Sequence, residues 1–279
     1  MSLTSFLKGD SELRILLDQT FEKPTLEIKA ERVADPQTTN YGLIGTAFDY
    51  ILRFKLERMY GVDSRPWVAN QGLALAELDG MTVDSTEKSL ATLLADAQRL
   101  HREYLDTGVM TDDLLGATLD LARLDGIYRS GRVADDFGQA LDGDIDDLRR
   151  LYEAIPEEEF SGAETVLLNP EFGSASKLVG GADGDIVLGS TLIDIKTVKE
   201  ATLKPDYWRQ LVGYAVLADI AHDELDHMPA FTEIGLYFSR HGVLWRTSAA
   251  RIYQHEKYAK FKSWFQQRAR EHFSGASPG

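Results

Sequence analysis

The most constraining part of this sequence is a pair of short apolar runs separated by a turn signal, Asp-Ile-Val-Leu-Gly-Ser-Thr-Leu-Ile-Asp-Ile-Lys at residues 185–196. Runs this short and this rich in branched apolar residues are typical of strands rather than helices. Gly189-Ser190 between them suits a two-residue hairpin loop, because glycine accepts the positive φ that the first position of a type II′ turn requires. The chain is therefore expected to contain an antiparallel strand pair, and with it a sheet.

The register of this hairpin follows from its turn. With Gly189-Ser190 as the loop, Asp185 lies opposite Asp194, and directly opposed residues share a face with Cβ atoms about 4.5–5.5 Å apart. Lys196 lies two positions beyond Asp194 and therefore on the same face. If the pairing extends further, Asp183 faces Lys196. We expect carboxylates and a lysine side by side on one face of the sheet.

Charges on a buried strand raise the free energy of the folded state unless they are paired or hold a ligand. One interpretation is structural: Asp194 and Lys196 form an exposed ion pair of little energetic weight, and Asp183 and Asp185 are ordinary turn residues. The other is functional, since two opposed acids repel each other unless a cation lies between them. Oxygen ligands suit Mg²⁺ or Mn²⁺, and Lys196 would then orient a bound water or stabilise negative charge.

The texture of the sequence changes at Pro156. Before it, apolar residues recur at helical spacing. The helices predicted there cover residues 11–20, 41–60, 111–129 and 145–155, and a further helix opens with Asp84 as its N-cap. After it, predicted strands at 165–168, 185–188, 192–195, 231–239 and 243–247 are joined by helices at 205–220 and 253–273. The expected fold is α/β, a mixed central sheet flanked by helices with a mainly helical lobe or insertion.

The 279 residues suffice for one large domain with an insertion. We expect residues 1–64 to contribute N-terminal helices to the core, residues 65–156 to form the helical lobe, residues 157–273 to form the core itself, and residues 274–279 to be a disordered tail. The chain has no cysteine, which excludes disulfides, thiolate metal sites and cysteine nucleophiles.

The charge and the N-terminus restrict the partners. The net charge of −15 disfavours broad adhesion to a phosphate backbone. It leaves room for a local basic groove, for which Lys177, Lys196, Lys199, Lys204 and Arg209 are available. Residues 1–8 lack the basic start and long apolar run of a signal peptide, and no stretch approaches the roughly 18 apolar residues of a membrane span. We expect no membrane partner and a cytoplasmic location.

Three motifs follow one another in the second half of the chain. They are Gly180-Gly181-Ala182-Asp183-Gly184-Asp185, then Asp194-Ile195-Lys196, then Gln210-Leu211-Val212-Gly213-Tyr214. This combination resembles the PD-(D/E)XK nuclease superfamily and, within it, the RecB-like and lambda-exonuclease-like group. The resemblance covers about residues 40–60 and 164–247 and leaves the helical middle unmatched. It implies a restriction-endonuclease-like core for residues 157–273.

By this resemblance, Asp194 and an upstream acid hold Mg²⁺ or Mn²⁺. Asp185 is the preferred upstream acid because it directly precedes an apolar run, and Asp183 is its competitor. The main-chain carbonyl of Ile195 is a further ligand in such sites. The resemblance makes Lys196 the catalytic lysine that assists the attacking water.

The helix element of the resemblance consists of Gln210 and Tyr214. These two residues lie one turn apart on a single helix face, where an amide and a phenol reach the same anionic ligand. The structural alternative is that Gln210 is ordinary helix surface and Tyr214 ordinary core.

Two upstream acids complete the set of predicted ligands. Gly45-Thr46-Ala47-Phe48-Asp49 has the spacing of the G-xxx-H element of RecB-like nucleases, with aspartate in the histidine's place. Arg53 lies four residues beyond Asp49, so a helical ion pair is the structural alternative. Glu171, just before the glycine-rich motif, is the other candidate.

The function predicted from these residues is metal-dependent hydrolysis of DNA phosphodiester bonds by an exonuclease, on single- or double-stranded DNA. The residues leave open RNA as substrate and cleavage within a strand. The alternative is a catalytically inactive nuclease-like module that binds nucleic acid or protein. A third interpretation is a metal-dependent hydrolase of another substrate.

Overall fold

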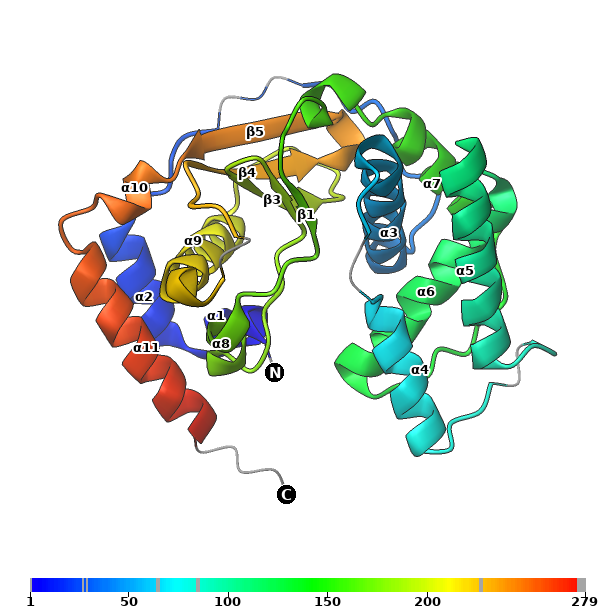
Figure 1. Cartoon of the computed structure of the whole chain (residues 1–279), viewed down its shortest axis with the longest axis horizontal. Coiled ribbons are helices and arrows are strands. Elements are labelled where there is room, and N and C mark those ends of the chain that lie inside the picture. Colours follow the sequence, from blue (N-terminus) through cyan, green and yellow to red (C-terminus); the bar gives the residue numbers. More distant parts are fainter. Residues whose placement is uncertain are drawn as a thin grey trace.

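The computed structural model describes residues 2–26, 28, 30–63, 66–83, 86–225 and 228–274 and, within them, a five-stranded mixed sheet between two sets of helices (Figure 1). The strands are β1 (Val166–Leu168), β2 (Ile186–Leu188), β3 (Thr191–Lys196), β4 (Glu233–Phe238) and β5 (Val243–Ser248), adjacent in chain order. All neighbours are antiparallel except β3 and β4, which are parallel because α9 (Pro205–Ile220) connects them. The α/β class predicted from the sequence is confirmed.

The hairpin with its turn at Gly189-Ser190 has the predicted register. Leu188 lies opposite Thr191, and Gly189 has a φ of +59° while Ser190 does not take a positive φ, as a type II′ turn requires. The predicted hairpin around residues 240–242 is also present, as β4 and β5. The sheet therefore places the Asp185 and Asp194 positions opposite each other at the end of the β2–β3 ladder.

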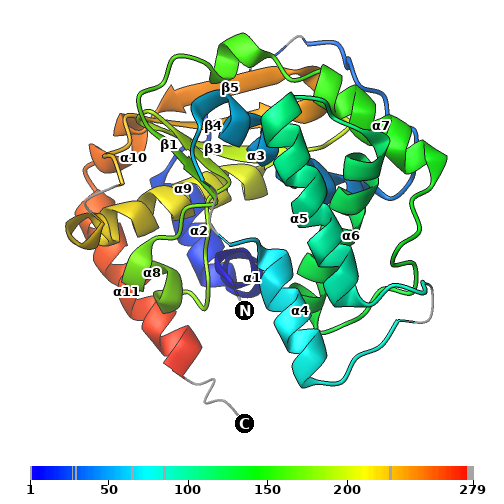
Figure 2. The same ribbon diagram turned by 45° about the vertical axis from the view of Figure 1, so that its right-hand side comes forward.

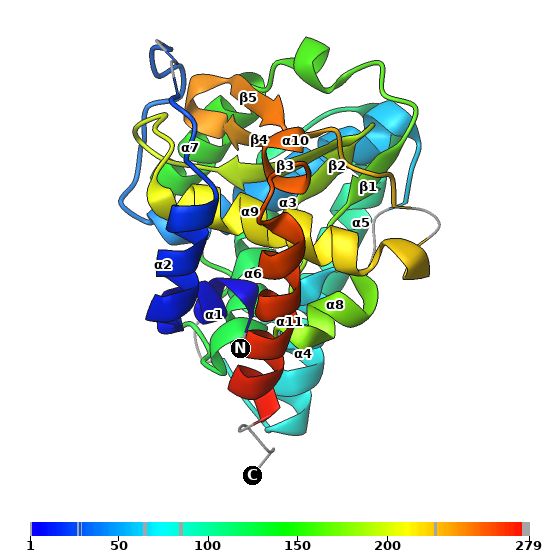
Figure 3. The same ribbon diagram turned by 90° about the vertical axis from the view of Figure 1, so that its left-hand side faces the viewer.

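One face of the sheet is covered by α9, with the N- and C-terminal helices packed around it (Figure 3). The terminal helices are α1 (Leu3–Gly9), α2 (Ser11–Thr20), α10 (Ala250–Tyr253) and α11 (Tyr258–Ser274), and α8 (Gly173–Leu178) packs in the same layer. Val187, Leu192 and Ile234 point into this layer and are fully buried. Since side chains alternate along a strand, Asp194 lies on the same face as Leu192, toward α9.

The opposite face is covered by α3 (Tyr41–Tyr60), whose Phe48 and Ile51 pack with Ile193 and Tyr237 in a second core cluster. The helix ends at Gly61, as predicted, in the left-handed conformation that glycine adopts without strain. Asp49 therefore belongs to a helix that is fixed against the sheet along much of its length.

The other side of α3 carries the helical lobe: α4 (Val68–Leu78), α5 (Leu90–Thr107), α6 (Asp112–Ser130) and α7 (Asp142–Glu153) (Figure 2). Its helices approach one another closely. A Cβ at Gly72 of α4 would lie 2.0 Å from the Leu124 carbonyl oxygen of α6, so only glycine fits at this crossing. Because α6 also packs on α3, the lobe is fixed to the helix that borders the sheet.

A buried ion pair joins the lobe to the sheet. Arg240, in the short 3₁₀ segment Ser239–His241 between β4 and β5, donates from Nη1 to Asp147 Oδ1 at 2.6 Å and from Nη2 to Oδ2 at 3.1 Å. The two side chains are 1% and 0% exposed. Arg240 also donates to the Ala34 carbonyl oxygen at 3.2 Å. We call the Asp147–Arg240 pair the clamp.

Most predicted helices are confirmed, at residues 11–20, 41–60 and 205–220 as predicted and at 112–130 within one residue. The single helix predicted at 253–273 is wrong, because α10 ends at Tyr253 and α11 starts at Tyr258. Helix α1 was not predicted, although Ser2 and Ser5 form its capping box.

Helix α5 begins at Leu90, where the Ser89 side chain caps the Thr92 N–H, so the prediction of an earlier start is wrong. Asp84, predicted to cap that helix, lies outside the described residues, as do residues 275–279 of the predicted tail; Ser274 ends α11. No helix in the described part of the chain is long and apolar enough to cross a membrane.

Candidate active site

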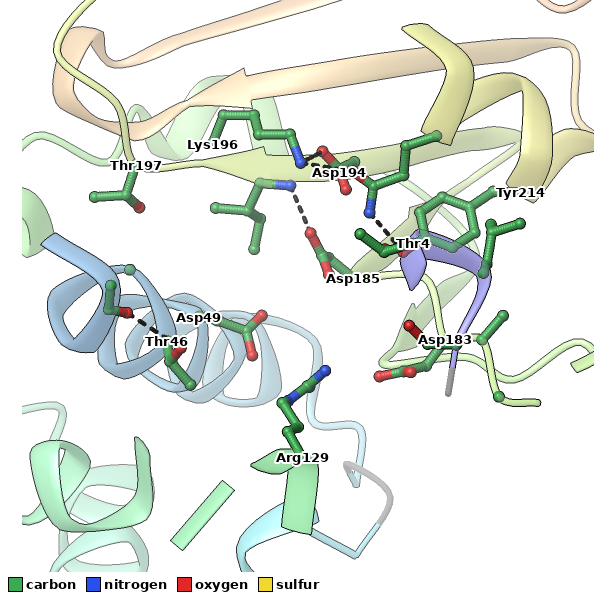
Figure 4. Close-up of a pocket in the computed structure, with 18 of the residues that line it drawn as sticks. Thr4, Thr46, Asp49, Arg129, Asp183, Asp185, Asp194, Lys196, Thr197 and Tyr214 are labelled. Carbon is green, nitrogen blue, oxygen red and sulfur yellow. Dashed lines mark hydrogen bonds and ion pairs between the residues drawn. The ribbon is translucent and has the colours of Figure 1, made fainter. Parts of the chain in front are cut away.

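A polar cavity of about 340 Å³ opens where the end of β3 meets α9, α3 and the start of α1 (Figure 4). Four aspartates and two cations line it: Asp49, Asp183, Asp185, Asp194, Lys196 and Arg129. Three chain segments supply them, since Asp49 comes from α3, Arg129 from the last turn of α6, and the others from the segment 183–196. The sheet thus brings the predicted acids and the predicted lysine into one cavity.

The hairpin holds the two central acids in place. Asp185 accepts the main-chain N–H of Ile195 at 2.6 Å, which fixes its carboxylate beside β3. Asp194 is 2% exposed, and its Oδ2 lies 2.5 Å from the Lys196 Nζ. Apart from that ionic contact, this buried oxygen accepts no hydrogen bond from the described residues. The central acid therefore has a lone-pair position to spare in a dry environment.

Electrostatics at this pair are unfavourable to two negative charges. Burial raises the pKa of the Asp185 carboxyl well above its usual value, and the charges of Asp194 and Asp49 raise it further. Burial also raises the pKa of Asp194, although Lys196 opposes this shift. Repulsion of this kind is relieved when a cation binds between the carboxylates.

Lys196 keeps its positive charge in this setting. Burial alone lowers the pKa of the Lys196 ammonium, but the carboxylates of Asp194 and Asp185 outweigh burial and raise it overall. The ammonium also donates to Gln210 Oε1 at 3.0 Å. A charged, well-held lysine lies directly beside the acid pair.

The predicted helix element supports that lysine. Gln210 turns its oxygen to the Lys196 ammonium and donates from Nε2 to the Tyr214 hydroxyl at 2.9 Å. Tyr214 is 6% exposed and stacks on Phe172, with ring centroids 5.7 Å apart. Burial raises the pKa of the Tyr214 phenol well above its usual value, and Asp194 adds to the shift. The phenol therefore stays protonated and serves as a neutral support for Gln210.

Asp183 lies in the cavity but outside the β2–β3 pairing. The β2–β3 pairing ends at Ile186 and Ile193, so it does not extend to Asp183 and Lys196; on the other edge of β2, the Asp183 main chain forms an isolated antiparallel bridge with Glu171. This bridge continues the antiparallel register of β1 and β2 beyond Leu168 and Ile186. Burial raises the pKa of Asp183, with Arg129 opposing the shift.

The two upstream acids differ in placement. Asp49 lines the cavity and also forms the predicted helical pair with Arg53, at 2.5 Å. The ion pair with Arg53 therefore does not turn Asp49 away from the cavity. Glu171 is exposed and is not among the residues that line the cavity; its main chain bridges Asp183, and its charge helps raise the pKa of the Asp183 carboxyl. Ile195 lines the cavity at the end of β3.

Lysines and tyrosines contact one another near Lys196 and near Tyr41, which lines the cavity. Lys199 Nζ lies 4.5 Å from the centre of the Tyr41 ring, and Lys204 Nζ lies 5.7 Å from that of Tyr207, which also has Lys196 Nζ at 4.9 Å. We call Tyr41, Lys199, Lys204 and Tyr207 the basic rim.

Two members of the predicted basic grouping lie elsewhere. The Arg209 guanidinium forms ion pairs with Asp18 and Asp206, at 2.5 and 2.6 Å. Lys177 lies on α8 near Glu224. These two residues do not add positive charge to the cavity.

A divalent cation fits the donor set of the cavity. Carboxylates with raised pKa suit a hard cation with oxygen ligands, and so does the buried Asp194 Oδ2, which contacts the Lys196 ammonium and accepts no other hydrogen bond from the described residues. Within the described residues, no group of three or more acidic or histidine side chains is gathered as a ready ligand set. Mg²⁺ commonly binds through one or two carboxylates, with water and substrate oxygens as its other ligands, and Asp185 and Asp194 suit that mode.

Arg129 and the first residues of the chain were not predicted to reach this site. Ser2, Leu3 and Thr4 line the cavity because the Leu3 N–H donates to the Gly181 carbonyl oxygen at 2.9 Å. No local signal marks either feature, since both depend on packing between distant segments.

Comparisons with known proteins give no relative: no protein-family model, no curated protein and no solved structure matches this chain.

Proposed function

We propose that this protein is a metal-dependent nuclease that hydrolyses DNA phosphodiester bonds. The observation that carries the proposal is the convergence of Asp185, Asp194 and Lys196 in one cavity, with the partly buried Asp185 opposite the buried Asp194 and the lysine 2.5 Å from Asp194. The mixed sheet flanked by helices is compatible with the restriction-endonuclease-like core implied by the PD-(D/E)XK resemblance.

In this proposal Asp185 and Asp194 hold Mg²⁺ or Mn²⁺. The bound ion supplies Lewis-acid polarisation of a phosphoryl oxygen and lowers the pKa of a bound water. Lys196, fully charged, orients the attacking water by hydrogen bonding and stabilises negative charge on the phosphate. Gln210 holds the lysine in position through a hydrogen bond, and Tyr214 accepts a hydrogen bond from Gln210.

The basic rim favours a nucleic acid over other phosphate esters. Tyrosine rings provide faces on which bases stack, and the lysines provide contacts to phosphates. In a chain with a net charge of −15, two lysine–tyrosine pairs beside the acid cluster concentrate positive charge where a strand would pass. Because such stacking needs unpaired bases, a single strand is the preferred form at the rim.

The test is cleavage of linear and circular DNA, single- and double-stranded, with Mg²⁺, Mn²⁺ or EDTA. Asp194→Asn is expected to lower the rate by about 10³-fold or more, as loss of a central charge in such a site does. Asp113→Asn, an exposed aspartate in the first turn of α6, is the control and should cut like the wild type. Linear-only cutting supports an exonuclease.

Two results would go against the proposal. Unchanged cutting by Asp194→Asn refutes the site assignment. No cutting of any substrate, together with no Mn²⁺ binding by calorimetry, favours instead a nuclease-like module that binds nucleic acid or protein without hydrolysis. If the protein hydrolyses a substrate other than nucleic acid and DNA does not compete with that substrate, the third alternative, a metal-dependent hydrolase of another substrate, is favoured.

A further inference from the structure

Arg129 is the one residue that the helical lobe contributes to the cavity among the described residues, and the function proposed above gives it no role. It lies in the last turn of α6, and its guanidinium points toward the acids from the side opposite β3 (Figure 4). Its side chain is 59% exposed. A long, exposed cation that points into an acidic cavity is placed to meet whatever enters.

The base of this side chain is held by the lobe. Its nearest acid is Asp125, one turn earlier on α6, with Nη2 3.9 Å from Oδ2. Asp125 is 2% exposed and accepts the Tyr50 hydroxyl at 2.6 Å, and that hydroxyl in turn accepts the Ala69 N–H at 3.2 Å. Asp125 is thus a fixed charge in the lobe interior that attracts Arg129 without a short hydrogen bond.

Several carboxylates pull on this guanidinium together. Burial lowers the pKa of Arg129, but the charges of Asp125, Asp183 and Asp49 outweigh burial and raise it overall. Three of the attracting acids, Asp183, Asp49 and Asp185, line the cavity. In the state described here, Arg129 supplies part of the positive charge that the acid cluster requires.

The second cation in the cavity is already engaged. Lys196 contacts Asp194 at 2.5 Å and Gln210 at 3.0 Å. Arg129, in contrast, directs its guanidinium toward the acids of the cavity, and its one ionic contact with a described residue is the 3.9 Å approach to Asp125. A guanidinium offers two parallel donors to one phosphate, which an ammonium cannot do.

We propose that Arg129 is a phosphate-binding residue that the helical lobe lends to the candidate active site, for the phosphate of a nucleic-acid strand held over the acids. This inference rests on the proposed function and names the group that receives the substrate phosphate. When a divalent cation takes over the charge of the carboxylates, the guanidinium is released toward the phosphate. Arg129 and the metal ion therefore compete for the acids when no substrate is present.

Two binding measurements test this, each independent of turnover. In Arg129→Ala, Mn²⁺ binding measured by calorimetry without DNA is expected to tighten about threefold to tenfold, because a competing charge is gone. Binding of a short fluorescein-labelled oligodeoxynucleotide in Ca²⁺ is expected to weaken about tenfold or more, since a charge-assisted contact to phosphate is lost. Arg129→Lys should keep the Mn²⁺ affinity of the wild type and recover only part of the oligonucleotide affinity.

Arg102→Ala is the matched control, because Arg102 is an exposed arginine of the lobe on α5 that does not line the cavity. Equal oligonucleotide binding by the Arg129→Ala and Arg102→Ala variants overturns the proposal, and so does weaker Mn²⁺ binding by Arg129→Ala. Because Arg129 is exposed, both variants should unfold at the wild-type temperature.

The two proposals fail separately. If the wild type cuts DNA and Arg129→Ala matches the control in both binding measurements, the role of Arg129 is refuted and the nuclease stands. If the wild type cuts nothing, but Arg129→Ala shows the expected changes in Mn²⁺ and oligonucleotide binding relative to the wild type, the nuclease is refuted and the phosphate-binding role stands.

Discussion

Two buried charge clusters of this protein have opposite designs. In the clamp, Asp147 and Arg240 form a bidentate pair with one charge of each sign. Asp147 also accepts a hydrogen bond from the Gln37 N–H, and Arg240 also donates to the Ala34 carbonyl oxygen. In the candidate active site, two opposed acids, Asp185 and Asp194, have one lysine beside them, and the Lys196 ammonium is the one contact of the buried Asp194 Oδ2 among the described residues. The clamp is balanced and the site has excess negative charge.

The difference separates a structural role from a ligand-binding one. A balanced pair joins two elements and needs nothing more, so the clamp can hold α7 to the β4–β5 connection. An unbalanced cluster is tolerated only if something outside the chain completes it. Raised pKa values at Asp185 and Asp194 express that cost in the protein alone.

The largest effect is expected from breaking the clamp. Arg240→Ala leaves the Asp147 carboxylate buried and unpaired, and should lower the free energy of unfolding by about 3–5 kcal/mol in urea titrations. Arg246→Ala is the control, since its pair with Glu159 is largely exposed and contributes about 0–1 kcal/mol. Equal losses in the two variants would mean that the clamp is no stronger than a surface pair.

A smaller change of opposite sign is expected at the site. Asp185→Asn keeps an oxygen that accepts the Ile195 N–H and removes one of the two opposed charges. In EDTA the variant should be more stable than the wild type by about 1–2 kcal/mol at neutral pH, as is common when a site optimised for binding is neutralised. A loss of stability would show that the acid pair is balanced after all.

The pH dependence of that gain has a definite sign. The pKa of Asp185 is raised in the folded protein, so the folded state holds its proton to higher pH than the unfolded state does. Ionisation above the unfolded pKa of about 3.9 therefore removes stability as the pH rises toward the folded pKa. The stability difference between Asp185→Asn and the wild type should accordingly widen from pH 4 upward, which thermal unfolding across pH measures.

Asp10 is the matched control of opposite sign. Burial raises the pKa of the Asp10 carboxyl, but Arg268 and the Leu13 N–H that it caps outweigh burial and lower it overall. Its stabilisation is present above the unfolded pKa and is lost as the pH falls through the folded one. Asp10→Asn should therefore be destabilised most at neutral pH, and a gain there would contradict the assignment of both signs.

The smallest effect is expected at Tyr214. Tyr214→Phe keeps the ring stacked on Phe172 and removes only the hydroxyl that accepts from Gln210. We expect a loss of about 1 kcal/mol or less in stability and a fall of less than tenfold in DNA cleavage, because the lysine keeps its contact with Asp194. A fall as large as that of Asp194→Asn would place the phenol among the groups that contact the reacting atoms.

Turn chemistry and side-chain periodicity were sufficient to predict the hairpin and the helix that carries Gln210 and Tyr214. The turn at Gly189-Ser190 determined which residues oppose each other, and helix periodicity placed Gln210 and Tyr214 on one face, while the contact of Gln210 with Lys196 was not predicted. The same rules did not show how far the ladder extends: the β2–β3 pairing ends before Asp183, whose main chain bridges Glu171 on the β1 side. Such a bridge depends on the path of the segment after β1, which no local pattern encodes.

Long-range packing also explains what the sequence could not reveal. Arg129 reaches the cavity only because α6 packs on α3 at the angle that the lobe core imposes. Nothing around Arg129 in the sequence distinguishes it from Arg102 or other exposed arginines of the lobe. Likewise, the neutralisation of Arg209 by Asp18 joins α9 to α2 and was not foreseeable from either helix alone.

The hydrogen bond from the Leu3 N–H to the Gly181 carbonyl oxygen has a consequence for how the chain becomes competent. Contacts between segments so far apart in sequence close late in folding, after the local hairpins and helices have formed. A ribosome-bound chain that has emerged only as far as the lobe carries Asp49 and Arg129 but neither β3 nor the loop that α1 meets. Assembly of the cavity is thus coupled to completion of the whole tertiary structure, and premature chains hold their acids apart.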